Sequence, residues 1–152
     1  MIRTLKASEV AEEPYRVWNA FVELIACTDF EDLAAGQRVA HLAFWYDAEV
    51  QNGGHYQYFL NLAGVRASIT VDALLELGLS GQADVLTAAM GRWRSAERVL
   101  PTTADEFIAD SALAAFDDLD AAYHRCVPSV TDALSAHLAA NRERFVCLET
   151  DA

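Results

Sequence analysis

The chain has 152 residues, of which 53% are hydrophobic and 10% are aromatic. This length and composition predict one folded domain with a substantial core and argue against intrinsic disorder. Aspartate and glutamate number 23 against 11 lysines and arginines, so the formal net charge is −12. Such a field repels nucleic acid and anionic membranes and attracts basic proteins, although net charge also serves simply to keep a protein soluble.

In chain order, the sequence predicts a weakly patterned lead-in over residues 1–13 and then a single all-helical domain over residues 14–152. Pro14 suits the first turn of a helix. Apolar residues recur after it at helical spacing, at Val17, Phe21, Leu24 and Ile25. Residues 28–30 predict a break, and a second helix is expected from about residue 31 to about residue 51.

The remaining elements are also predicted to be helices. A short helix is expected over residues 55–62 and ends at Gly64, and the next has Ile69 and Leu74 inward and ends at Gly78. A helix opening at Ser80 or Gly81 is stopped by Pro101. An acidic helical region from Thr103 to about residue 126 opens on a capping box completed by Glu106. The last helix follows Pro128 and turns Val130, Leu134 and Leu138 inward. Because no strand is predicted, the expected fold is all-α: one compact multi-helix domain.

The most distinctive stretch lies where the second helix breaks and restarts. Two adjacent glycines can adopt positive φ angles and allow close backbone approach, so they predict a corner between two helices. The polar side chains around them are expected to satisfy backbone groups that the break leaves free. The residues of this stretch that carry the pattern are Glu49, Asn52, Gly53, Gly54, His55, Gln57, Tyr58, Phe59 and Asn61.

This stretch resembles the signature of the DMP19-like (DUF4375) family, and weaker helical similarity extends over roughly residues 30–146. One position departs from the family pattern: His55 follows the glycine pair, and the expected aromatic residue comes one place later, at Tyr56. The family takes its name from members proposed to mimic DNA. The resemblance therefore implies a helical fold and, more loosely, an acidic protein that binds a DNA-binding protein.

An acidic interaction surface is predicted in the segment between Arg98 and Arg125, which contains no other basic residue. Its acidic residues are Asp105, Glu106, Asp110, Asp117, Asp118 and Asp120. Carboxylates four residues apart on a helix are separated by about 6 Å of rise, while phosphates advance about 3.4 Å per strand step in B-DNA. Helical carboxylates can therefore imitate a phosphate track, but a solvated helix face also collects acids.

A second candidate site is a small pocket lined by Asn52, His55, Gln57 and Asn61, with His55 as acid or base. No recognisable nucleophile accompanies these residues, which favours a structural role for them. Such a pocket would make the protein a small-molecule binder or enzyme.

No cofactor and no metal are expected. The four histidines form no HxxxH or HExxH pair, and the three cysteines, Cys27, Cys126 and Cys147, form no CxxC pair. No apolar leader or run of eighteen apolar residues is present, so a cytoplasmic protein is expected.

Three functions follow from these patterns. The preferred one is a non-enzymatic module whose acidic surface binds a basic protein, such as the DNA-binding face of a transcription factor, without binding nucleic acid or membrane itself. The second is an immunity-type or antitoxin-like inhibitor of a basic toxin. The third is the small-molecule binder or enzyme centred on the corner. A homodimer is compatible with all three.

Overall fold

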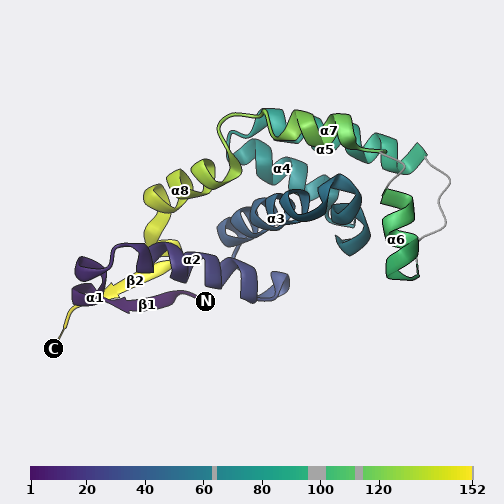
Figure 1. Cartoon of the computed structure of the whole chain (residues 1–152). Helices are drawn as coiled ribbons and strands as arrows, with labels where there is room; N and C mark the ends of the chain where they lie inside the picture. Colours follow the sequence, from purple (N-terminus) through teal and green to yellow (C-terminus); the bar gives the residue numbers. More distant parts are fainter. Residues whose placement is uncertain (63–64, 96–101, 112–114, 152) are drawn as a thin grey trace.

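The structure is a computed structural model that describes residues 1–62, 65–95, 102–111 and 115–151, apart from the side chains of Leu62, Phe107, Ile108, Asp110 and Ser111. It is mostly helical, which confirms the predicted class, and it adds one small sheet. Its α-helices are α1 Ala7–Glu12, α2 Tyr15–Cys27, α3 Ala35–Leu62, α4 Ala67–Glu76, α5 Ser80–Ser95, α6 Ala104–Ser111, α7 Asp117–Tyr123 and α8 Val130–Asn141 (Figure 1).

The sheet corrects the expectation of a chain without strands and of an irregular lead-in. Strand β1 (Arg3–Lys6) pairs in parallel with β2 (Val146–Glu149), and helix α1 follows β1 directly. Only four residues on each side take part, and the two strands come from opposite ends of the chain. Strand formation at this length depends on the pairing partner rather than on local pattern, so periodicity within residues 1–13 could not reveal it.

Helix α2 behaves as predicted on its inward face, where Phe21, Leu24 and Ile25 are fully buried, while Val17 is half-buried. The second helix, in contrast, begins later than expected. Residues Phe30–Asp32 form a separate 3₁₀ turn, η1, and α3 starts only at Ala35. The boundary moves because Gln37 caps this start with its side-chain oxygen, which accepts from the Ala34 N–H at 3.1 Å.

Helix α3 lies at the centre of the molecule, with α4 packed against it and α5 packed against α4 (Figure 1). Helix α7 packs against α5 and also contacts α3 directly. Tyr46, Tyr58 and Phe59 of α3 are fully buried, and their rings meet those of neighbouring residues at right angles or in stacks. Edge-to-face aromatic pairs of this kind add about 0.5–1.5 kcal/mol each beyond the area they bury. An aromatic cluster around α3 therefore forms part of the core, together with aliphatic residues of the other helices.

The later helices follow the sequence in most respects. Gly78 ends the α4 turn with φ +75° and α5 begins at Ser80, both as predicted. Ile69 is 43% exposed, so its predicted inward position was wrong. Helix α8 begins at Val130 behind an N-cap at Ser129, with its predicted apolar face buried. The predicted helix ends at Gly64 and Pro101 lie outside the described residues.

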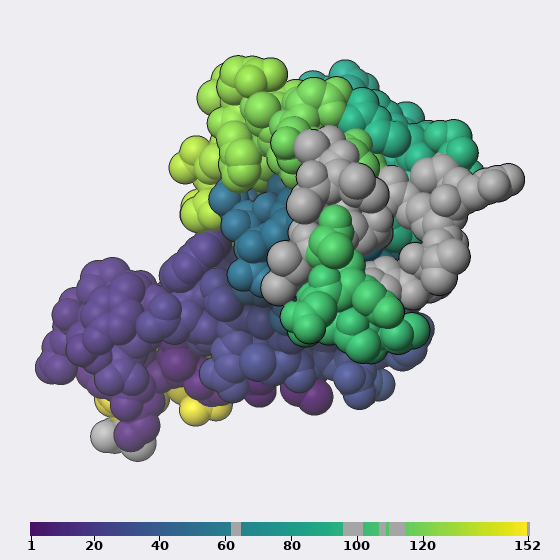
Figure 2. Space-filling model, turned by 45° about the vertical axis from the view of Figure 1, so that its right-hand side comes forward, coloured from purple at the N-terminus to yellow at the C-terminus, as the bar shows by residue number. Residues whose placement is uncertain are grey.

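Helix α6 does not lie beside α7, the helix that follows it in the chain. Figure 2 shows it at the front of the molecule, away from α7, although the two are consecutive in the chain. Its N-terminus carries the predicted capping box: the Thr103 hydroxyl accepts from the Glu106 N–H at 3.2 Å, and the Glu106 carboxylate accepts from the Thr103 N–H at 3.2 Å. The local sequence thus fixes the residue at which α6 begins.

Candidate functional site

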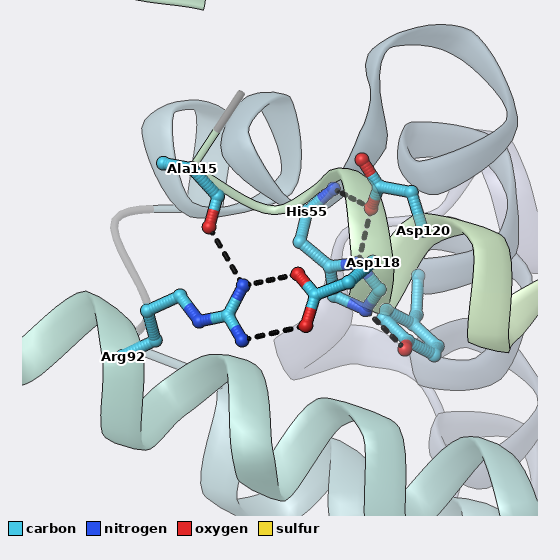
Figure 3. A network of polar contacts seen from close by, with 6 residues as sticks. His55, Arg92, Ala115, Asp118 and Asp120 are labelled. Carbon is cyan, nitrogen blue, oxygen red and sulfur yellow. Dashed lines mark hydrogen bonds and ion pairs between the residues drawn. The ribbon is translucent and has the colours of Figure 1, made fainter. Parts of the chain in front are cut away.

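The predicted corner is present inside α3, where Gly53 (φ −157°, ψ 26°) and Gly54 (φ 71°, ψ −174°) leave the helical conformation. The Gly54 pair of angles belongs to a region that essentially only glycine adopts. The helix restarts at His55, whose backbone N–H donates to Asp120 Oδ1 of α7 at 2.9 Å (Figure 3). A carboxylate from a helix distant in sequence therefore accepts a hydrogen bond from the backbone N–H that the break in α3 leaves free.

The same carboxylate also holds the ring of His55, which is fully buried. Asp120 Oδ1 lies 2.5 Å from His55 Nδ1, and the Tyr46 hydroxyl lies 2.8 Å from His55 Nε2. Burial alone would raise the pKa of Asp120, but the hydrogen bonds from the His55 ring and backbone outweigh it and leave that pKa lowered. Asp120 is thus an ionised acceptor, so Nδ1 donates to it.

The neighbouring tyrosine completes this network. Burial raises the pKa of Tyr46 well above its usual value, so its hydroxyl keeps its proton, and this hydroxyl is the hydrogen-bond partner of His55 Nε2. Both ring nitrogens are therefore occupied within the protein. With no exposed surface, His55 cannot meet a substrate in this arrangement, and its contacts fix the corner instead.

The amides of the motif lie on the other side of the corner, away from His55. Gln57 Nε2 donates to Glu49 Oε2 at 2.7 Å, and Asn61 Nδ2 donates to the same oxygen at 2.8 Å. These amides hold a carboxylate, and the expectation that they would satisfy backbone groups was wrong for both. Asn52 is exposed, and within the described part of the chain its side chain makes no hydrogen bond. The four polar residues of the predicted pocket therefore do not converge on one space.

An open groove of about 860 Å³ lies beside Glu49 and its partner Asn61, both of which line it. Its walls come from the end of α2, from η1, from both segments of α3 and from the first turn of α4. Trp45, Glu49 and Asn61 line it together with His41. His41 Nδ1 donates to the Ile25 carbonyl at 2.7 Å, and burial lowers the pKa of this histidine, so it is neutral near pH 7. Sequence reasoning did not find this groove, because residues of four separate elements build it.

The predicted acidic residues are divided among different surroundings. Asp105 and Glu106 lie exposed on α6, and Asp117 and Asp118 lie exposed on α7, while Asp120 is partly buried against His55. The side chain of Asp110 lies outside the described residues. Helices α6 and α7 lie apart in Figure 2, so Asp105 and Glu106 are not neighbours of Asp117 and Asp118.

Although the sequence segment between Arg98 and Arg125 contains no basic residue, an arginine of another helix lies against α7. This corrects the prediction that the segment is free of cations. Arg92 of α5 makes a two-pronged ion pair with Asp118, whose Oδ2 is 2.8 Å from Nη2, and Arg92 Nη1 also donates to the Ala115 carbonyl at 2.8 Å (Figure 3). The hydrogen bonds from Arg92 lower the pKa of Asp118 to about 2. Packing of α5 against α7 brings this arginine across, and spacing along the chain gives no sign of it.

Two absences bear on other kinds of site. Among the described residues, no group of three or more histidine, cysteine, aspartate or glutamate side chains is placed to hold a metal ion. No helix in the part of the chain that the structure describes is long and apolar enough to cross a membrane.

Comparison with known proteins gives one match. The model of the family described as DMP19-like protein matches residues 31–141, which include the whole of α3 and its corner. No curated protein and no solved structure matches the chain.

Proposed function

The chain belongs to the DMP19-like family, and on that premise we propose that it is a non-enzymatic acidic protein that occupies the nucleic-acid-binding surface of a basic partner protein. A transcription factor is the kind of partner expected. The mechanism is competition: carboxylates of this protein take the lysine and arginine side chains that would otherwise contact phosphate.

The observation that carries this proposal is the unequal exposure of the two kinds of charge. Sixteen acidic residues of the described chain are exposed, against five basic ones. Several arginines are half-buried and engaged within the protein: Arg92 binds Asp118, and Arg38 donates to the carbonyls of Phe30 and Glu31 at 3.0 and 2.7 Å. Arg38 directs these donors to backbone carbonyls rather than to carboxylates. The surface thus presents its negative charge outward, toward a cationic partner.

The strongest exposed acids for such a contact are those without an internal cation. Asp105 of α6 and Asp117 of α7 meet this condition among the described residues, whereas Asp118 is paired with Arg92 and Asp120 with His55. Glu31 and Asp32 of η1 form a second exposed acidic segment, in which Glu31 is paired with Arg66. Exposed carboxylates contribute mainly to the rate of encounter, since rim charges steer association.

The proposal is tested by charge reversal with a matched control. The partner is captured from the native cell, and its association rate is then measured with purified protein over a series of salt concentrations. Asp105→Lys/Asp117→Lys should slow association, while Glu12→Lys/Glu143→Lys makes the same change of charge at exposed positions in α1 and directly after α8. Figure 1 shows α1 at the opposite end of the molecule from α6. Equal rates for the two double variants would show that the acids of α6 and α7 have no special part.

The result also separates the proposed function from the other two. A basic toxin as the captured partner, bound without competition from DNA, would favour an immunity-type inhibitor. This arrangement does not support an enzyme or small-molecule binder centred on His55, because the His55 side chain is buried and both its ring nitrogens are hydrogen-bonded.

A further inference from the structure

The groove beside the corner has a charge and a shape that select a cation. Four carboxylates line it, from Asp29, Glu31, Asp32 and Glu49, against the single cation of Arg66. The formal charge of its lining is therefore −3, because His41, the histidine in its wall, is neutral near pH 7. A concave wall with one sign of charge concentrates ions of the other sign.

One oxygen of the Glu49 carboxylate is fixed by hydrogen bonds, and the other is available to such an ion. Its Oε2 accepts from both Gln57 and Asn61, which fixes the carboxylate, while Oε1 makes no hydrogen bond within the described part of the chain. Trp45 lies one helical turn earlier on α3, is half-buried and lines the same groove. A fixed carboxylate beside an indole offers a planar guanidinium both a charge-assisted hydrogen bond and a surface to stack on.

The groove already contains one arginine held in this manner. The guanidinium of Arg66 lies 4.3 Å from the centre of the Phe30 ring and 3.5 Å from Glu31. This internal example combines an aromatic face with a carboxylate in the same wall. Trp45 and Glu49 repeat the combination, and no arginine of the described chain is paired with Glu49.

We propose that this groove binds an arginine side chain of the basic partner protein, with Glu49 as its hydrogen-bond acceptor and Trp45 as its stacking surface. The inference rests on the proposed function for the nature of the partner and adds a specific contact to it. Lysine fits less well, because its ammonium is a compact, strongly hydrated charge without a planar face. Gln57 and Asn61 are positioning residues, since they act through Glu49.

The test uses the full chain and N-acetyl-arginine amide as the probe, with two-dimensional NMR of the tryptophan indole N–H groups as the readout. The chain has three tryptophans, of which only Trp45 lines this groove. The probe should shift the Trp45 signal and leave those of Trp18 and Trp93 in place. N-acetyl-lysine amide should shift it less at the same concentration.

Matched variants decide whether Glu49 is responsible. Glu49→Gln should weaken the probe at least about tenfold, because a hydrogen bond to a charged acceptor is lost. Asp117→Asn removes the same charge at an exposed position outside the groove and should change the affinity less than about twofold. Asn61→Ala, which keeps every charge, should weaken the probe by loosening Glu49. Unchanged dispersion of the spectrum shows that each variant folds.

Equal weakening by Glu49→Gln and Asp117→Asn, or equal shifts of all three tryptophans, would overturn the assignment and leave only general attraction to an acidic protein. The proposed function would survive that outcome if DNA still competes for the captured partner. If the probe instead binds as described while DNA does not compete, the groove is an arginine site and the DNA-mimic function fails.

Discussion

Replacing Gly54 by alanine tests the corner most sharply, because this residue meets two separate constraints. Its φ and ψ of 71° and −174° are essentially restricted to glycine, and a Cβ atom there would lie 2.3 Å from Asp120 Oδ2. Alanine must therefore adopt a strained backbone and also displace the carboxylate that holds His55. Gly78 supplies the control, since its φ is +75° but a Cβ atom there would meet nothing within 4 Å.

The magnitude follows from these two constraints. Backbone strain of this kind costs about 1–3 kcal/mol. Displacing Asp120 also weakens its hydrogen bonds to His55, and a hydrogen bond to a charged group contributes about 1.5–3 kcal/mol. We expect Gly54→Ala to lower the free energy of unfolding by about 3–6 kcal/mol. Gly78→Ala should cost about 1–2 kcal/mol, which is strain alone.

Urea denaturation followed by circular dichroism measures both losses. A double-mutant cycle with Asp120→Ala then isolates the contribution of the carboxylate. In that background Gly54→Ala should cost only its backbone strain, about 1–3 kcal/mol, since no carboxylate remains to be displaced. The reasoning is refuted if Gly54→Ala costs the same with and without Asp120, or if it is no more damaging than Gly78→Ala.

Two further predictions concern protons. Burial lowers the pKa of His41 and of His137 below the ordinary 6.5, so the unfolded chain binds protons more readily and stability is lost as the pH falls below 6.5 through the folded values. The melting temperature should therefore drop between about pH 7.5 and pH 5.5, less so in His41→Gln, and a flat profile would contradict this. Arg92→Met should let the pKa of Asp118 rise from about 2 toward 3.8, as followed by NMR titration, and should speed amide exchange in α7; an unmoved pKa would show that Arg92 is not its cause.

Much of the fold could be predicted from the sequence, because the apolar spacing within a single segment is enough to predict a helix. Leu24 and Leu134 recur with their neighbours at helical spacing and are buried as that spacing requires. The corner could also be predicted from neighbouring residues, because two adjacent glycines are enough to indicate it. The β1–β2 pair was not predictable in this way, because Arg3 finds its partner Val146 at the other end of the chain.

The candidate site shows where local reasoning ends. His55 and Gln57 are two residues apart, so a helix turning about 100° per residue places them on different faces. One of them enters the core toward Asp120, and the other reaches out to Glu49. Which residues of the motif contact one another depends on the direction in which the helix restarts. Arg92 likewise reaches Asp118 only through the packing of α5 against α7.

The measurement that tests the central claim most directly is competition on the captured partner between this protein and a labelled DNA duplex that the partner binds. Fluorescence anisotropy of the duplex reports its release. The protein should displace the DNA completely, and displacement should weaken as added salt shortens the screening length from about 8 Å at physiological ionic strength. DNA that stays bound while the protein also binds the partner would contradict the claim that the two share one surface.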